Sequence, residues 1–222
     1  EKINKAKELR KKALEETEQI FQSALKSIFD KVEKKYELKL LKDVLNQIQY
    51  GLSKKMNKTG KGYKILRMDN IINGRIEEKN IKYVEIDKKE FLKYKLEKGD
   101  ILFNRVNSFE LVGKTGIFDL DGNYTFASYL IRLKVNPNFL EPYFLNYFLN
   151  SPQTQGRLRF IARRAVQQAN INAKGVSSLE IPLPPLSEQK KIVAYLDNLR
   201  EKVEKLKRLQ EEQLKGLEEL KN

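Results

Sequence analysis

Two stretches of this sequence are rich in cationic side chains and contain no carboxylate, and the second also contains several amide side chains. The first runs from Lys54 to Arg67, and the second lies between Glu141 and Glu180. Lysine and arginine attract phosphate groups, whereas arginine pairs with guanine edges and the amides of asparagine and glutamine match adenine. The chemistry that these residue types favour is therefore recognition of a nucleic acid, with backbone and base contacts made by neighbouring side chains.

The candidate DNA-contacting residues fall into three groups. They are Lys54, Lys55, Lys58, Lys61 and Tyr63 in the first stretch, Arg105, Asn107 and Ser108 after the apolar run 101–103, and Arg163, Arg164, Gln167, Gln168 and Asn170 in the second stretch. The middle group should lie at a strand end, where side chains point outward. For the middle group the alternative is an ordinary turn, and for the last group it is a solvated loop; the residue types alone leave these interpretations open.

Catalytic chemistry has few candidates here. Without Cys or His, thiolate zinc sites, cysteine nucleophiles and imidazole acid–base catalysis are excluded. Glu-x-Lys triplets such as Glu188-Gln189-Lys190 occur, but none follows a Pro-Asp pair, and no converging carboxylates are identifiable for a metal. Gly113-Lys114-Thr115 lacks the first glycine of a phosphate-binding loop. We expect no enzyme activity, no metal and no cofactor.

The positive charge is concentrated in the middle of the chain. Residues 31–185 carry 28 basic and 16 acidic groups, which gives +12 of the total net charge of +14. Residues 1–30 and 186–222 are nearly balanced. Such an excess favours polyanions or anionic membrane surfaces as partners. No apolar run approaches the roughly 20 residues that span a bilayer, and the N-terminal residues lack a signal-peptide core. We therefore expect a soluble, cytoplasmic protein.

Apolar residues recur at three- and four-residue steps at both ends of the chain, which predicts two long amphipathic helices. The first covers residues 1 to about 29, and the second begins after Pro184-Pro185 with Ser187 as its cap. The second averages 3.5 residues per step, which is typical of a coiled-coil seam; a helix lying on a globular core is the alternative. The expected contact residues are Leu14, Phe21 and Ile28 in the first helix and Ile192, Leu196, Leu199, Val203, Leu206 and Leu217 in the second, with Gln210 and Gln213 at two further seam positions.

Between these helices the period changes to two. The alternation across Leu130–Val135 predicts a strand, and Asp121-Gly122-Asn123 predicts a hairpin turn between 116–118 and 125–127.

Two short helices should follow, one around Pro142 to Leu149 and one opened by Ser151-Pro152. The predicted fold class is α+β: a mixed domain over residues 31–185, flanked by two long coiled-coil-type helices over residues 1–30 and 186–222.

One long motif resembles a known family. Ile181-Pro182-Leu183-Pro184-Pro185-Leu186-Ser187-Glu188-Gln189-Lys190-Lys191-Ile192, followed by a heptad helix, closely resembles the end of a target recognition domain in type I restriction-modification specificity subunits. Further similar segments, in the family's order, are Tyr94-x-Leu96-x-x-Gly99-Asp100-Ile101-Leu102-Phe103-Asn104-Arg105, Val112-Gly113-Lys114 and Phe126-Ala127-Ser128-Tyr129-Leu130-Ile131-Arg132. Together the segments cover most of residues 31–200.

The resemblance implies a non-catalytic subunit that recognises double-stranded DNA. Such subunits have two recognition domains, each for one half of a bipartite target, separated by two antiparallel helices that set the spacing. The helices also dock methyltransferase subunits, which use S-adenosylmethionine, and through them restriction subunits, which hydrolyse ATP. None of those cofactors need bind to this chain.

Only one such domain is present here, and two explanations fit. The chain is the second half of a longer subunit, or it is a half-subunit that homodimerises and reads an interrupted palindrome. A basic scaffold for RNA or an acidic protein is the alternative function, with Tyr63, Tyr83 and Tyr94 stacking on unpaired bases.

Overall fold

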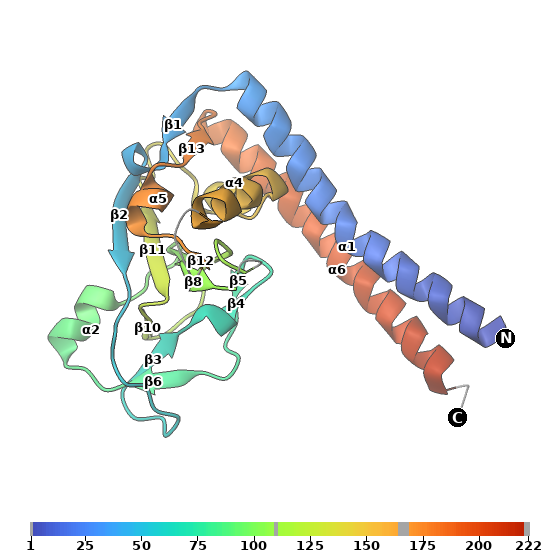
Figure 1. Cartoon of the computed structure of the whole chain (residues 1–222), viewed down its shortest axis with the longest axis horizontal. Coiled ribbons are helices and arrows are strands. Elements are labelled where there is room, and N and C mark those ends of the chain that lie inside the picture. Colours follow the sequence, from blue (N-terminus) through green and yellow to red (C-terminus); the bar gives the residue numbers. More distant parts are fainter. Residues whose placement is uncertain (1, 109–110, 164–168, 220–222) are drawn as a thin grey trace.

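The computed structural model describes residues 2–108, 111–163 and 169–219. Two long helices, α1 (Lys2–Lys35) and α6 (Leu186–Glu219), project together from a mixed domain of strands and short helices (Figure 1). This arrangement confirms the predicted α+β fold class.

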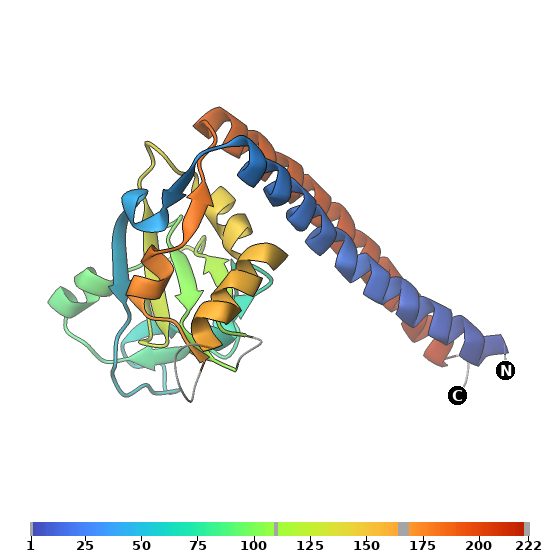
Figure 2. The same cartoon turned by 45° about the horizontal axis from the view of Figure 1, so that its top comes forward.

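The helices α1 and α6 run antiparallel and lie side by side, so that the start of α1 and the end of α6 meet far from the domain (Figures 1 and 2). Each has 34 residues and is therefore roughly 50 Å long. Near the domain Leu25, Phe29 and Leu196 are fully buried. The first helix continues past the predicted end at Phe29 because Val32 also joins the core. Among the described helices, none has an apolar stretch long enough to cross a bilayer.

The main sheet has six strands in the order β2-β11-β7-β9-β5-β4. Only the β5–β9 pair within it is parallel. The central strand β7 is buried along its whole length, and β11 nearly so, because helices and the second sheet cover the two faces. The strands are β2 (Leu45–Tyr50), β4 (Ile71–Ile72), β5 (Arg75–Ile76), β7 (Ile101–Asn104), β9 (Thr115–Ile117) and β11 (Leu130–Val135).

Three smaller sheets complete the domain. One has the order β10-β3-β6, and the others are the antiparallel pairs β1–β13 and β8–β12. The β1–β13 pair lies where the chain enters the domain from α1 and leaves it toward α6 (Figure 1). The strands are β1 (Leu38–Leu40), β3 (Tyr63–Leu66), β6 (Lys82–Val84), β8 (Val106–Asn107), β10 (Tyr124–Phe126), β12 (Ala169–Asn170) and β13 (Glu180–Pro182).

The predicted hairpin around Asp121-Gly122-Asn123 is wrong. The strand β9 belongs to the six-stranded sheet, whereas β10 pairs in parallel with β3 in the three-stranded one. The turn, with Gly122 at φ 129°, carries the chain from one sheet to the other. Phe118 and Tyr124 pack edge to face at 5.3 Å in the core between the sheets, so burial decides the pairing rather than the turn residues.

The two predicted short helices are present as α3 (Pro142–Leu149) and α4 (Pro152–Arg163). In α3 the rings of Phe144 and Phe148 pack on Phe29 of α1, with centroids 5.4 and 5.5 Å apart, which anchors the long helix on the domain. The remaining helical segments are α2 (Lys88–Tyr94), α5 (Ala173–Ser177) and the 3₁₀ turns η1 (Leu41–Asp43) and η2 (Met68–Asn70).

Gln189 explains part of the long motif before α6. Its fully buried amide donates to the carbonyl oxygens of Phe139 and Pro184, at 2.8 Å each, and accepts from the Glu141 N–H at 2.9 Å. The helix begins at Leu186, one residue before the predicted cap, because the Pro185 carbonyl already accepts the first helical N–H groups. The motif thus fixes the direction in which α6 leaves the domain.

Candidate nucleic-acid interface

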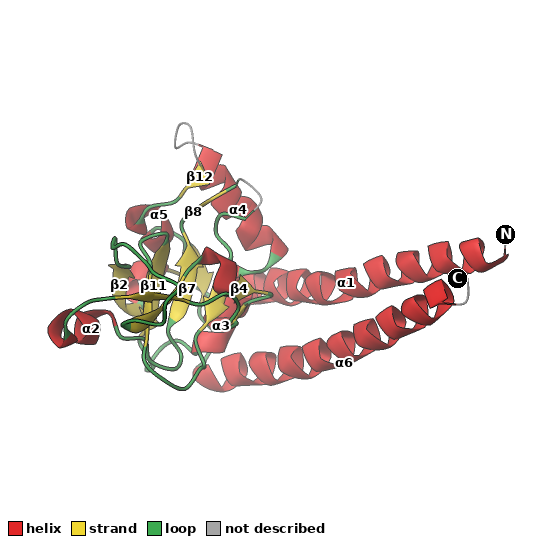
Figure 3. Cartoon of the chain, turned by 90° about the horizontal axis from the view of Figure 1, so that it is seen from below, coloured by secondary structure: helices red, strands yellow, loops and turns green. Residues whose placement is uncertain are grey.

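The structure brings the middle candidate group together with Asn170 of the third group. Val106–Asn107 pairs antiparallel with Ala169–Asn170, forming the two-stranded ribbon β8–β12. The Ile171 N–H extends the contact by donating to the Arg105 carbonyl at 2.9 Å. Loops more than 60 residues apart in the sequence therefore form one surface, which Figure 3 shows beside α4 and α5.

Arg105 is held in a fixed orientation at the base of this ribbon. Its Nη2 donates to Asn170 Oδ1 at 3.1 Å, and its Nη1 donates to the Ser128 carbonyl at 3.3 Å. The guanidinium also lies 5.0 Å from the centre of the Tyr50 ring, a cation–π distance. The Tyr50 hydroxyl accepts from the Ala173 N–H at 2.8 Å. A guanidinium positioned in this way loses little side-chain entropy when it binds a flat polar edge.

Two tyrosines lie at this surface that the sequence did not identify as candidate binding residues. Tyr50 and Tyr129 are 41% and 45% exposed, and the Arg105 N–H donates to the Tyr129 carbonyl at 3.0 Å. Tyr50 ends a strand, and Tyr129 lies in a segment that resembles the specificity-subunit family, but neither has a local signal for binding. Their contacts with Arg105 depend on the pairing of β2, β7 and β11, which the sequence does not reveal.

The basic loop joins the same surface through Leu52. The Ser128 N–H donates to the Leu52 carbonyl at 2.8 Å, next to the turn that contacts Arg105. Asn57 organises the loop, because its side chain donates to the Lys61 carbonyl at 2.9 Å and accepts from the Thr59 N–H at 3.0 Å. Gly62 is required at its end, because a Cβ there would lie 2.1 Å from the Val84 carbonyl oxygen.

The lysines of the loop are not equivalent. Lys54 forms an ion pair of 3.3 Å with Glu90 of α2. Lys55, Lys58 and Lys61 are exposed, and no carboxylate of the described residues lies within 4.0 Å of them. Among the described residues of the first group, these three lysines are therefore exposed and have no acidic partner.

Tyr63 has a packing partner. Its ring stacks on Phe91 with centroids 3.8 Å apart and planes 6° apart, and the side chain is half-buried. One face of the ring is therefore covered by the domain itself.

Several cations of the carboxylate-free stretches have acidic partners elsewhere in the fold. Lys64 pairs with Glu78, a contact that raises the pKa of Lys64 and lowers that of Glu78. Arg67 lies 3.0 Å from Asp69. Arg157 forms a bidentate ion pair with Glu33 of α1, with N–O distances of 2.9 and 2.6 Å. These side chains hold elements together and add less free positive charge than the sequence suggested.

The other candidates have positions as follows. Ser108 is exposed, and its carbonyl accepts from the Leu111 and Val112 N–H groups. Asn107 lies in β8, and Arg163 is the last residue of α4. Arg164, Gln167 and Gln168 lie outside the described residues.

The buried carboxylates serve the fold. Asp100 lies 3.4 Å from the buried guanidinium of Arg132, which also donates to the Lys95 carbonyl at 2.8 Å. Burial raises the pKa of Asp100, against the opposing effect of the Glu97 N–H and the Arg132 charge. Within the described ranges, no three carboxylates gather closely enough to hold a metal ion.

Comparison with known proteins assigns a family to this fold and surface. Residues 33–215 match the family model of the type I restriction modification DNA specificity domain. The chain belongs to this family, which is one of specificity domains and not of catalytic ones.

Individual relatives agree with this assignment. The chain is 40% identical over 169 residues to the putative type I restriction enzyme MjaX specificity subunit of Methanocaldococcus jannaschii, covering 74% of this chain and 40% of that subunit. A chain from a solved type I R-M system superposes with a TM-score of 0.78 at 25% identity, covering 99% of this chain and 53% of the other. The HsdS subunit of Thermoanaerobacter tengcongensis gives 0.65 at 26% identity, covering 99% and 52%. This chain therefore spans about half the length of these solved relatives.

Proposed function

We propose that this chain reads one half of a bipartite double-stranded DNA target for a type I restriction-modification complex, without a cofactor of its own. The observation that carries the proposal is the β8–β12 ribbon, where Arg105 is held by Tyr50 and Asn170 beside the basic loop. A two-stranded ribbon fits the major groove, where arginine can pair with guanine through two hydrogen bonds.

The chemistry of the side chains separates those that bind phosphates from those that contact bases. Lys55, Lys58 and Lys61 contact phosphates and supply affinity that depends on salt but not on sequence. Arg105 and the amides of Asn170 and Gln168 contact base edges and supply the choice of sequence. Tyr129, whose carbonyl accepts from the Arg105 N–H, has an exposed side chain that provides an apolar surface for a thymine methyl group.

The long helices dock methyltransferase subunits, and through them restriction subunits. Apolar side chains that the helix pair leaves exposed support this part of the proposal: Leu9 and Ile20 on α1, and Tyr195, Leu206 and Leu209 on α6. A spacing of 11 residues brings Leu9 and Ile20, and likewise Tyr195 and Leu206, to one face of their helices. Exposed apolar residues that gather on one face are a common feature of protein-binding surfaces.

The second half of the target requires a second recognition domain. It comes from the remainder of a longer subunit or from a second copy of this chain, and the length ratio to the solved relatives fits both.

Competition binding tests the proposal against an RNA- or protein-binding scaffold. The purified chain is bound to a labelled pool of random duplexes and challenged with unlabelled duplex DNA, single-stranded DNA and double-stranded RNA of equal length. The proposal predicts that duplex DNA competes best. A stronger effect of single strands or RNA would favour the scaffold and overturn the proposal.

A further inference from the structure

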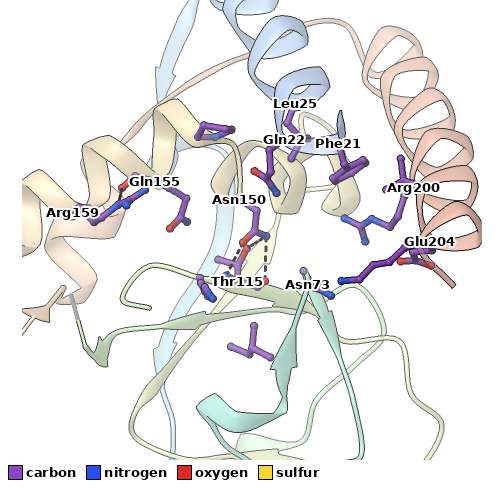
Figure 4. Close-up of a pocket in the computed structure, with 16 residues that line it drawn as sticks. Phe21, Gln22, Leu25, Asn73, Thr115, Asn150, Gln155, Arg159, Arg200 and Glu204 are labelled. Atoms are coloured by element: carbon purple, nitrogen blue, oxygen red, sulfur yellow. Dashed lines mark hydrogen bonds between the residues drawn. The ribbon is translucent and has the colours of Figure 1, made fainter. Parts of the chain in front are cut away.

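A cleft of about 620 Å³ lies in the corner where the domain meets the long helices. Four elements form its walls: α1, α6, the start of α4 and the β4–β5 turn, with β9 at its floor (Figure 4). The cleft is separate from the β8–β12 ribbon and contains none of the residues assigned there to base or phosphate contacts.

The charged residues that line the cleft are mostly basic. They are Lys114, Arg159, Arg200, Lys207 and one acid, Glu204. Glu204 already pairs with Arg75 at 3.6 Å. Arg200 is buried between the rings of Phe21 and Tyr147, at 5.0 and 4.7 Å, and so helps to join helix and domain.

Lys114 and Arg159 are the cations available at the mouth of the cleft. No carboxylate of the described residues lies within 4.0 Å of either side chain. The Arg159 Nε donates to the Gln155 carbonyl at 3.1 Å, an intrahelical bond that leaves the two terminal nitrogens for a ligand. The amides behind them are satisfied within the fold, because Asn150 exchanges hydrogen bonds with Thr115 and Asn146 donates to the Gly74 carbonyl.

Both cations belong to segments that also carry the proposed DNA-reading residues. The Asn104 N–H donates to the Lys114 carbonyl at 2.9 Å, so Lys114 closes the loop that begins with Arg105. Arg159 lies one turn before Arg163 at the end of α4. The loop that begins at Arg105 and the helix α4 therefore each link the region of the ribbon to the cleft.

The path of the DNA follows from the proposed function. If α1 and α6 separate the two recognition halves, the DNA between the half-sites must run alongside these helices. A duplex that leaves the ribbon in that direction passes the corner between domain and helices. Its phosphates carry one negative charge per roughly 1.7 Å of axis, so a basic corner there meets a continuous anionic partner.

We propose that the mouth of this cleft, through Lys114 and Arg159, binds the phosphate backbone of the DNA between the two half-sites, which we call the gap DNA. This second contact is independent of sequence and rests on the proposed half-site function. It holds the gap DNA against the helix pair and so couples the recognised half-site to the spacing between the halves.

The test uses two duplexes that share a half-site selected from random DNA with the wild-type chain. One is extended by about 10 base pairs on the gap side, and the other by the same length on the outer side. The wild-type chain should bind the gap-side duplex more tightly. The variant K114Q/R159Q should bind that duplex roughly tenfold more weakly in 0.15 M salt, and its log–log salt dependence should flatten by about 2. Its affinity for the outer-side duplex should change less than twofold.

The control variant K31Q/K34Q removes the same charge from exposed positions of α1, on the helix face opposite Leu25, and should leave both affinities unchanged. Thermal unfolding confirms that each variant is folded. Equal binding of the two duplexes by the wild-type chain, or equal losses for both duplexes in K114Q/R159Q, would overturn the inference and leave the half-site function intact. If selection yields no preferred half-site, the proposed function itself fails.

Discussion

At the scale of single residues, we propose that Arg105 gives the surface its ability to distinguish bases, in addition to attracting phosphates. Its guanidinium is fixed by Tyr50, Asn170 and the Ser128 carbonyl before any DNA binds. A lysine would keep the charge but lose the planar fork and the stacking on Tyr50.

The variant R105K should therefore lose discrimination more than affinity. We expect a cost of about 1–3 kcal/mol for the preferred half-site and a nearly unchanged affinity for random duplex. Binding to the half-site and to its single-base substitutions measures both. R157K is the control, because Arg157 is engaged by Glu33. A substitution profile identical to the wild type would remove Arg105 from the reading set.

For the lysines of the basic loop we predict the opposite effect, a loss of affinity without a loss of discrimination. K55Q/K58Q should weaken binding to all duplexes alike and flatten the log–log salt dependence by about 2. K54Q should have a smaller effect per charge, because Lys54 already pairs with Glu90. Titrations at several salt concentrations provide the comparison, and a loss restricted to one sequence would contradict the assigned role.

The sequence overestimates the number of unpaired cations in the two carboxylate-free stretches. Lys64, Arg67 and Arg157 lie in stretches without carboxylates, yet each finds an acidic partner. For Arg157 the partner is 124 residues away, on a different element, and local composition carries no information on such a contact. Gln168 remains a prediction from residue type alone.

At the scale of elements, the two long helices could be predicted from the sequence. The residues through which they contact each other could be predicted only in part. Leu196, Val203, Gln210 and Leu217 of the predicted seam are buried or half-buried. Between them, Lys207 and Leu214 are half-buried, while the expected Leu206 and Gln213 are exposed. A lysine can bury its aliphatic stem and keep its charge in water. The pattern of apolar residues alone therefore does not determine which side chains lie between the two helices.

Strand pairing was the least predictable level. Two-residue strands such as β8 and β12 have no measurable period, and their pairing follows from the arrangement of the larger sheet. The mistaken hairpin has the same origin, because a good turn sequence specifies a reversal of the chain but not which strand will be its neighbour.

The junction between domain and α6 depends on Gln189. Q189A leaves the Glu141 N–H and the carbonyls of Phe139 and Pro184 without their partner in a buried site. We expect a loss of about 2–4 kcal/mol in the free energy of unfolding, measured by urea denaturation. Q213A, on an exposed position of the same helix, should change stability by less than about 0.5 kcal/mol. Equal effects of the two variants would contradict the role of Gln189.

At the scale of the whole molecule, we propose that the domain binds DNA and that the helices bind protein partners. Y195E/L206E places charge on the exposed apolar face of α6 and should abolish co-purification with a methyltransferase subunit, while the DNA affinity of the isolated chain stays within about twofold. L92E, at an exposed leucine of α2, serves as the control and should retain the complex. A complex that survives Y195E/L206E would place the docking surface elsewhere.

Selection from random DNA tests whether this chain recognises a DNA sequence. The purified chain, alone and with a methyltransferase subunit, is incubated with a pool of random duplexes, and the retained molecules are sequenced. We predict an enriched motif that weakens in R105K, and a palindrome with a fixed gap if two copies of the chain supply the two halves. Retention without any enriched motif would contradict sequence recognition and reduce the domain to a basic, non-specific binder.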